Sequence, residues 1–251
     1  MEIRGNRVLI TGGCGGIGTA IAREFLKLNT KVILCDLNIE TGLELAKRHD
    51  GVVCLQMDLG DTQEIDRHLK PLIESDDAPD ILVNNVGISP KKDTAGKAYN
   101  TWEMPLEQWN RVMAVNLTSY FYCSKLVVPA MKEKGGGRII NIDSLAVRTG
   151  GYVAPVHYVV SKSGVLGLTK VLAKEVAQFG INVNAINPGR IDTPMIHDVP
   201  DEVNQSYIER IPAGRLGLPE DVAKVVVFLT SDLSDYITGT AIEVNGGLFM
   251  G

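Results

Sequence analysis

The stretch 7–18, RVLITGGCGGIG, joins a short apolar run to a cluster of glycines. Residues 7–11 have the β-branched composition of a buried strand, and an apolar pattern with helical spacing follows Gly18. Glycines at such a junction let the backbone turn tightly, and they bring free N–H groups at a helix N-terminus close to a pyrophosphate. A glycine cluster alone is weak evidence, but one placed between a strand and a helix predicts the first βα turn of a dinucleotide-binding fold.

An acidic residue closes the next strand-like run, KVILCD, at Asp36. In this context an acid accepts hydrogen bonds from the ribose hydroxyls of adenosine. A 2′-phosphate about 4 Å from Asp36 would be repelled by about 4 kcal/mol at an effective dielectric constant near 20. No Arg or Lys in the glycine loop or directly after Asp36 offers a phosphate anchor, so we predict NAD rather than NADP. The alternative is a helix cap or a surface acid.

Outward from this unit, strand-like and helix-like runs alternate along the chain. The predicted helices reach Leu28, His49 and Ser75, and two long ones span about 106–132 and 154–178. This alternation predicts βαβ units. We expect an α/β fold of the Rossmann type, a three-layer, doubly wound parallel sheet of seven strands in a single domain over residues 1–251. The predicted strands are RVLIT, KVILCD, GVVCLQMD, DILVNNVG, RIINIDS, INVNAINPG and AIEVNGG.

Composition excludes several classes of protein. The chain has 251 residues and a net charge of -5, and its acids and bases are interspersed, so we expect no nucleic-acid partner. No apolar stretch approaches the roughly 20 residues that span a bilayer, and the first residues lack a signal-peptide pattern. The four cysteines form no C-x-x-C pair, so we expect no metal site and no disulfide framework. Free thiols fit a cytoplasmic protein.

The run HYVVSK, residues 157–162, places a phenol and an ammonium group on one face of a predicted helix, at Tyr158 and Lys162. To act as a base near pH 7, a tyrosine needs a pKa about 3 below its usual value near 10, or roughly 4 kcal/mol. One ammonium group at about 4 Å supplies about that much in a partly dry cleft. The alternative is a buried tyrosine anchor beside an extended surface lysine.

Several further motifs follow one another along the chain. They are Asp58-Leu59, NNVG at 84–87, Asn116, Ser144 and PGRIDT at 188–193. With TGGCGGIG at 11–18 and Tyr158-x-x-x-Lys162, they make the chain resemble the short-chain dehydrogenase/reductases over nearly its whole length. The resemblance implies a catalytic tetrad of Asn116, Ser144, Tyr158 and Lys162. In it Tyr158 exchanges the proton, Ser144 holds the substrate oxygen, and Asn116 positions a water. Lys162 lowers the tyrosine pKa and binds the nicotinamide ribose.

The resemblance also implies an NAD site, in which Asp58 binds the adenine amino group and residues 85–87 line the adenosine. Thr193 and the backbone of Ile191 hold the carboxamide. The implied cofactor-binding residues are Gly12, Gly15, Gly16, Ile17, Gly18, Asp36, Leu37, Asp58, Leu59, Asn85, Val86, Gly87, Tyr158, Lys162, Pro188, Gly189, Ile191 and Thr193. The segment 215–247 resembles the family's C-terminal signature, which makes subunit contacts, and this implies a homotetramer by analogy.

We expect an NAD-dependent oxidoreductase that interconverts a secondary alcohol and a ketone, or a primary alcohol and an aldehyde. A small polar or anionic substrate is the main prediction, because Arg148, His157 and Arg190 flank the implied cleft and arginine binds anions well. The alternative for these residues is ion pairing with acids such as Asp143 or Asp192.

Two other functions share the motifs. A 3-oxoacyl-acyl-carrier-protein reductase usually uses NADP, so Asp36 weighs against it. A non-catalytic NAD-binding regulator is disfavoured by the complete tetrad. Two long connections, 88–105 and 189–218, leave the carboxyl ends of predicted strands, where open α/β sheets bind ligands. We expect a substrate lid at 196–212, whereas the role of the stretch from Lys91 to Trp109 stays open between substrate binding and a surface or subunit contact.

Overall fold

In the computed structural model, which describes residues 1–92, 96–151, 153–197 and 201–251, seven strands pair in parallel. Their order is β3-β2-β1-β4-β5-β6-β7, so the chain starts in the middle of the sheet and winds outward in both directions. The predicted seven-stranded, doubly wound sheet is confirmed. The strands are β1 (Arg7–Thr11), β2 (Lys31–Asp36), β3 (Val52–Gln56), β4 (Ile81–Asn84), β5 (Gly137–Ile142), β6 (Ile181–Pro188) and β7 (Ala241–Val244).

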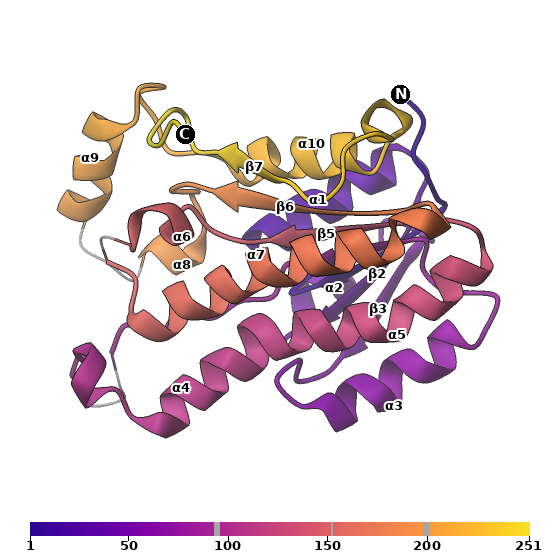
Figure 1. Cartoon of the computed structure of the whole chain (residues 1–251), viewed down its shortest axis with the longest axis horizontal. Coiled ribbons are helices and arrows are strands. Elements are labelled where there is room, and N and C mark those ends of the chain that lie inside the picture. Colours follow the sequence, from indigo (N-terminus) through magenta and orange to yellow (C-terminus); the bar gives the residue numbers. More distant parts are fainter. Residues whose placement is uncertain (93–95, 152, 198–200) are drawn as a thin grey trace.

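Helices cover both faces of this sheet (Figure 1). On one face the core is shared by α1 (Gly16–Lys27), α2 (Glu40–Ala46) and α10 (Pro219–Leu229). On the other it is shared by α3 (Thr62–Ile73), α5 (Ser119–Glu133) and α7 (Val156–Val176). The shorter elements are η1 (Thr101–Glu103), α4 (Leu106–Met113), η2 (Ala114–Thr118), α6 (Ala146–Thr149), η3 (Ala177–Phe179), α8 (Pro194–His197), α9 (Asp201–Arg210) and η4 (Asp232–Ser234).

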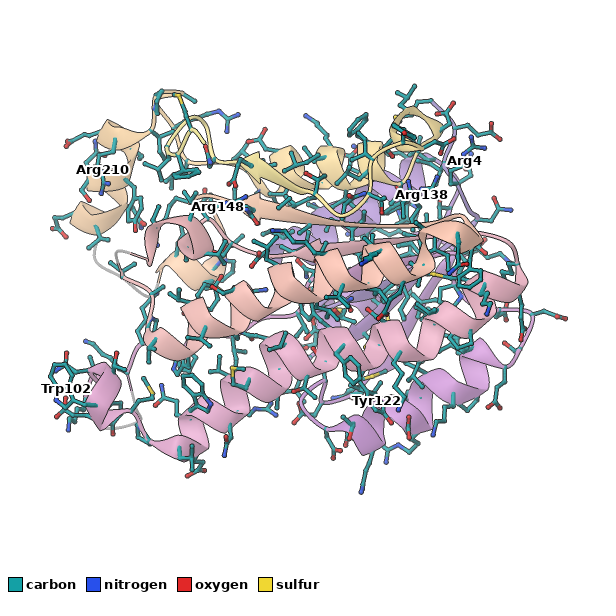
Figure 2. The ribbon with its side chains drawn as sticks, viewed as in Figure 1. Arg4, Trp102, Tyr122, Arg138, Arg148 and Arg210 are labelled. Carbon is teal, nitrogen blue, oxygen red and sulfur yellow. The ribbon has the colours of Figure 1, made fainter. Side chains whose placement is uncertain are left out.

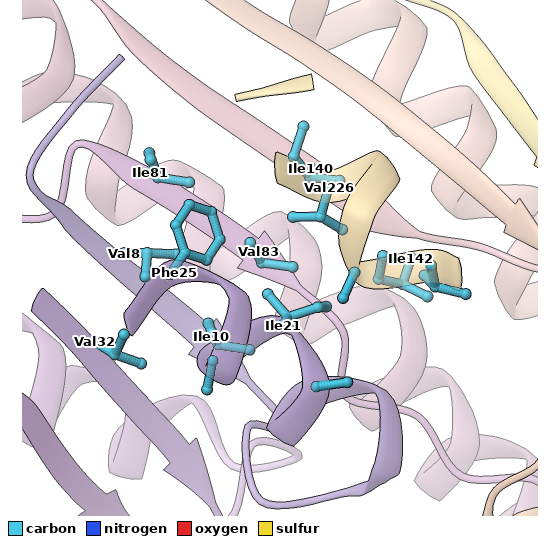
Figure 3. Close-up of a cluster of buried hydrophobic side chains, with 14 of the residues drawn as sticks. Val8, Ile10, Ile21, Phe25, Val32, Ile81, Val83, Ile140, Ile142 and Val226 are labelled. Carbon is cyan, nitrogen blue, oxygen red and sulfur yellow. The ribbon is translucent and has the colours of Figure 1, made fainter. Parts of the chain in front are cut away.

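The packing of α1 in the core of the first face fixes the position of the glycine loop at the end of β1. Ile21 and Phe25 of α1 are fully buried against strand residues such as Ile10 (Figure 3). Burying side chains of this size stabilises the packed state by about 1.5–3 kcal/mol each. The helix is therefore held firmly against the sheet, and its N-terminus is fixed at the end of β1.

The strands end earlier than predicted wherever the chain turns out of the sheet. β4 stops at Asn84, because the next two N–H groups, of Asn85 and Val86, donate to the Thr11 hydroxyl at 3.0 and 3.3 Å instead of to a neighbouring strand. β5 likewise stops at Ile142, before Ser144. The predicted motif residues therefore lie in loops just beyond the sheet.

The helix predicted over 106–132 is interrupted, which corrects that expectation. The π-helical turn η2 separates α4 from α5 and contains Asn116. Asn116 uses its amide to bond the backbone of Ile88, outside the helix, and a π turn accommodates such an inserted contact. The helix predicted over 154–178 begins at Val156 and ends at Val176, followed by one 3₁₀ turn.

The two long connections are only partly described. Residues 93–95 of the first connection and residues 198–200 of the predicted lid lie outside the described residues. In the described part of the first connection, η1 projects from the body of the molecule, and Trp102 on it is 83% exposed (Figure 2). In the part of the chain that was searched, no helix has the length and apolar character needed to cross a membrane.

Candidate active site

A cavity of about 620 Å³ opens at the carboxyl ends of the strands. Nearly all of the predicted cofactor residues line it, together with three of the four predicted catalytic residues. The predicted residues on its wall are Gly12, Gly15, Gly16, Ile17, Asp36, Leu37, Asp58, Leu59, Asn85, Val86, Gly87, Ser144, Tyr158, Lys162, Pro188, Gly189, Arg190, Ile191 and Thr193. Gly18, Asn116, Arg148 and His157 are not on that wall.

The glycine loop leaves room for a ligand backbone where side chains would block it. Gly12 has a φ of +62°, in the left-handed region that favours glycine. A Cβ on Gly16 would stand 2.9 Å from Cγ2 of Thr193, and a Cβ on Gly18 would stand 2.2 Å from the carbonyl oxygen of Gly12. Gly18 therefore packs the helix onto the loop, while the loop itself forms a cradle into which a pyrophosphate fits.

Asp36 lies at the rim of this cradle, at the end of β2. Its Oδ2 accepts the Cys14 N–H at 3.0 Å, and its Oδ1 accepts the Asn38 N–H at 3.4 Å. These bonds hold the carboxylate beside the glycine loop and on the cavity wall. A negative charge fixed there suits two ribose hydroxyls and disfavours a phosphate.

Asp58 is paired in a way that was not foreseen. Arg111 of α4 donates to Oδ2 at 2.9 Å and to Oδ1 at 3.0 Å, and the Gly60 N–H donates to Oδ1 at 2.8 Å. Burial opposes ionisation of Asp58, but these donors outweigh it and lower its pKa. Asp58 was predicted to bind the adenine amino group, and both of its carboxylate oxygens already accept hydrogen bonds within the protein. Arg111 also lines the cavity, and no spacing in the sequence singled it out.

Tyr158 and Ser144 face each other across the cavity wall, from α7 and from the loop after β5. The expected decrease of the Tyr158 pKa is wrong for the protein itself. Burial raises that pKa and the nearby Asp143 raises it further, whereas the Ser144 side chain lowers it through a hydrogen-bonding interaction. The Ser144 hydroxyl is kept in place by the N–H of Ala146, which donates to it at 3.1 Å.

Lys162 is buried, and its ammonium group is held away from bulk water. Nζ donates to the carbonyl oxygen of Ile142 at 2.7 Å and to the hydroxyl of Tyr120 at 2.9 Å. Burial lowers the pKa of Lys162 to about 8, and Asp143 acts in the opposite direction. Tyr120, on α5, is itself fully buried, and its hydroxyl lies 2.9 Å from the carbonyl oxygen of Val86. The sequence reasoning missed Tyr120, although it follows Asn116 by four residues, one helical turn away.

Asn116 is fully buried and acts on the backbone of Ile88. Its Oδ1 accepts the Ile88 N–H at 2.9 Å, and its Nδ2 donates to the Ile88 carbonyl at 2.9 Å. Nδ2 also lies 3.2 Å from the hydroxyl of Ser161 on α7. The amide predicted to position a water therefore joins three segments: the loop after β4, the π turn and α7.

Two of the three predicted substrate residues are directed elsewhere. Arg148, which is labelled in Figure 2, donates from Nε to Glu243 of β7 at 2.9 Å, an ion pair of the kind weighed as the alternative but with a different acid from Asp143 or Asp192. His157 is fully buried with Nε2 3.1 Å from the Gln108 amide, and burial lowers its pKa. Neither side chain lines the cavity, where both were expected: Arg148 pairs with Glu243, and His157 contacts Gln108 through Nε2, while its buried Nδ1 has no hydrogen bond in the described part of the chain.

Arg190 is the substrate candidate that reaches the cavity. Its guanidinium donates to Oδ1 of Asn204 at 2.7 and 3.1 Å and stacks 4.8 Å from the ring centroid of Tyr207. Both partners belong to α9, so the arginine joins the end of β6 to the region of the predicted lid. Burial lowers the pKa of Arg190.

Comparison with known proteins agrees with this geometry. Residues 12–249 match a family model described as enoyl-(acyl carrier protein) reductase. A 3-oxoacyl-acyl-carrier-protein reductase of Aquifex aeolicus is 39% identical, with 99% of each chain covered. An acetoacetyl-CoA reductase of Rhizobium meliloti is 40% identical over 96% of this chain and 97% of its own.

A solved structure from Brucella melitensis, described as a 3-oxoacyl-acyl-carrier-protein reductase with bound NAD, superimposes with a TM-score of 0.88 at 37% identity. The match covers 98% of this chain and 92% of the other. The chain is thus similar to these proteins over nearly its whole length. It also has a parallel sheet, a glycine cradle, and a Ser-Tyr-Lys group at the strand ends. The chain belongs to the short-chain dehydrogenase/reductase family, oxidoreductases that act on a keto or hydroxy group with a nicotinamide cofactor.

Proposed function

We propose that this protein is an NAD(H)-dependent reductase of 3-oxoacyl thioesters. The observation that carries the proposal is a set of apolar side chains on the cavity wall, several of them in the segments next to Ser144 and Tyr158 in sequence. They are Leu145, Val153, Ala154, Met195, Ile196 and Leu248. Such a wall suits an acyl chain better than a small polyol or hydroxy acid, because it offers apolar contact and few hydrogen-bond partners. The two named reductases that resemble the chain point the same way.

The choice of NAD follows from Asp36. Its carboxylate stands at the end of β2 beside the glycine loop, held by two backbone N–H groups. A bound nicotinamide dinucleotide supplies the hydride for reduction of a ketone. A 2′-phosphate in that position would meet the carboxylate and be repelled by several kcal/mol before screening, at about 4 Å and an effective dielectric constant near 20.

The side chains of the protein supply the proton and the charge. Tyr158 donates its hydroxyl proton to the carbonyl oxygen as that oxygen gains negative charge, and Ser144 donates a hydrogen bond to the same oxygen. Burial raises the pKa of Tyr158, so the phenol holds the proton that it donates in the reduction. Lys162, fixed by Tyr120 and Ile142, places a positive charge near the phenolate that remains.

The test is turnover with acetoacetyl-CoA, followed through the loss of NADH absorbance, with NADPH as the second cofactor and Tyr158→Phe as the control variant. We expect NADH-dependent reduction that this variant loses. A polyol and a short hydroxy acid, each with NAD, form the opposing arm. Faster turnover of the polyol or the hydroxy acid than of the thioester would reject the assignment to acyl substrates. If none of the three substrates is turned over, the proposal of an enzyme is wrong and a non-catalytic NAD-binding protein is indicated.

We also propose a homotetramer, on the resemblance of the C-terminal segment to the family's subunit-contact signature, and a cytoplasmic location, on the free thiols. Light scattering coupled to size-exclusion chromatography measures the assembly directly. A monomer across the concentrations used for the assay would contradict it.

A further inference from the structure

A row of polar side chains crosses the strand ends beside the candidate active site. Ile142 of β5 pairs in register with Ile186 of β6, so Asp143 lies opposite Asn187, and Asn187 pairs in register with Glu243 of β7. Neighbours in register point to the same face of a parallel sheet. Ile142, Ile186 and Ile242 pack on the opposite face, so the row faces α6 and α7.

Each member of this row has a buried oxygen without a hydrogen bond of normal geometry in the described part of the chain. The oxygens are both carboxylate oxygens of Asp143, Oδ1 of Asn187 and Oε2 of Glu243. Glu243 nevertheless has a cation, because Arg148 donates to its Oε1 at 2.9 Å. Asp143 has no such bond, although it is only 3% exposed. A buried carboxylate in that state either holds a proton or depends on a nearby cation.

The nearby cation is Lys162. Its Nζ lies 2.7 Å from the carbonyl oxygen of Ile142, the residue directly before Asp143, and Lys162 is also 3% exposed. The backbone of Asp143 is fixed, since its N–H continues the sheet by donating to Ile186 at 2.8 Å. The titratable groups that act on Asp143, or on which it acts, come from four elements. They are Lys162 and Tyr158 of α7, Tyr120 of α5, Arg148 of α6 and Glu243 of β7.

The two buried charges change their protonation over the same range of pH. Burial raises the pKa of Asp143 to about 7, while Lys162, the Ser144 backbone N–H and Arg148 oppose that rise and Glu243 adds to it. Burial lowers the pKa of Lys162 to about 8, while Asp143 opposes that decrease. As pH rises through neutrality Asp143 becomes an anion, at the point where Lys162 would otherwise begin to lose its proton.

We propose that Asp143 is a positioning residue of the active site, a buried counter-charge for Lys162 that acts through it on Tyr158. The proposal rests on the proposed function for its effect on turnover. Its electrostatic part, the coupling of Asp143 to Lys162, does not depend on any substrate.

The substitution Asp143→Asn keeps the shape of the side chain and mimics the protonated acid. At about pH 6, where Asp143 already holds its proton, the variant should reduce acetoacetyl-CoA within about twofold of the wild type. Above about pH 8 its kcat should fall about tenfold below that of the wild type. A decrease of about one in the pKa of Lys162 shifts the basic limb of the kcat profile by about one pH unit, and kcat at a given pH on that limb then changes about tenfold. A merely structural defect would lower kcat by the same factor at every pH, and that outcome would overturn the proposal.

A double-mutant cycle of urea unfolding tests the coupling without turnover, combining Asp143→Asn with Lys162→Met. We expect the two changes to be non-additive at about pH 8, where both groups are charged, and additive at about pH 5.5, where Asp143 is neutral. Additivity at both pH values would refute the coupling even if the enzyme turns over. If the cycle shows coupling but no substrate is reduced, the proposed function fails and the charge pairing stands. If both profiles of kcat against pH are parallel, Asp143 has no role in turnover.

Discussion

Tyr120→Phe removes a single oxygen atom from a fully buried ring and leaves its packing in place. The lost hydroxyl accepts from Lys162 Nζ at 2.9 Å, and the contact of Nζ with the ring, 4.8 Å from its centroid, is retained. The change therefore removes one acceptor of the ammonium group that is proposed to stabilise the Tyr158 phenolate. It also removes the contacts of the hydroxyl with the carbonyl oxygens of Val86 and Ile142, at 2.9 and 3.0 Å. The carbonyl of Ile142 remains as the other partner of the ammonium group.

A hydrogen bond to a charged group contributes about 1.5–3 kcal/mol, and each 1.36 kcal/mol is a factor of ten in rate. If the bond serves the transition state in full, kcat/KM for acetoacetyl-CoA reduction falls about ten- to a hundredfold. The variant is also less stable to urea by about 1–3 kcal/mol, because a buried ammonium group loses an acceptor.

The assay is NADH oxidation at saturating cofactor, with urea unfolding of the same preparations. Tyr122→Phe is the matched control, because Tyr122 lies two residues further along α5 and bonds Asp66 at 2.9 Å, away from the cavity. That control should keep kcat/KM within about twofold of the wild type, because the hydroxyl that it removes bonds Asp66 and lies away from the cavity. Wild-type kcat/KM in Tyr120→Phe would refute the claim that this hydroxyl anchors Lys162.

Three further predictions follow from the site. Tyr158→Phe should lower kcat by about a hundred- to ten-thousandfold, as loss of a general acid does, while NADH binding measured by fluorescence changes little; retained turnover would reject the acid assignment. Asp36→Ala should raise the NADPH/NADH ratio of kcat/KM by about tenfold or more, since it removes the repulsion; an unaltered ratio would count against the ribose contact. Gly18→Ala should weaken NADH binding about tenfold, because its Cβ would stand 2.2 Å from the Gly12 carbonyl oxygen. Gly167→Ala on α7 has open space and is the control; equal affinities in the two variants would contradict the packing argument.

The fold could be predicted from the sequence because its signal is local and repeated. Each strand is an apolar run, each helix follows it, and the glycine loop marks where the first pair meets. The boundaries were less predictable where side chains replace backbone bonds. Thr11 ends β4 by accepting two N–H groups, and Asn116 opens a π turn by bonding Ile88, and both contacts join residues that are far apart in sequence.

The candidate site was predictable in its motif residues but not in the residues that support them. Arg111, Tyr120 and Asp143 belong to no motif, and each becomes relevant only when folding brings it beside Asp58 or Lys162. Arg148 and His157 illustrate the opposite error. Arg148 follows the motif residue Ser144 by four residues and His157 directly precedes Tyr158, but closeness in sequence did not imply a place on the cavity wall, because a helix turns its side chains to different sides.

The clamp that Asn116 makes on Ile88 has a consequence for how this protein can change. A second tie follows closely, since the Gln108 amide donates to the carbonyl of Pro90 at 3.1 Å. The chain is thus fastened both where it leaves the sheet and again two residues later, before the excursion that carries Trp102. Because both ties precede Lys91, substitutions in the described stretch 96–104 leave them in place. The anchoring of the chain at the end of β4 and the surface that Trp102 presents are therefore set by different residues.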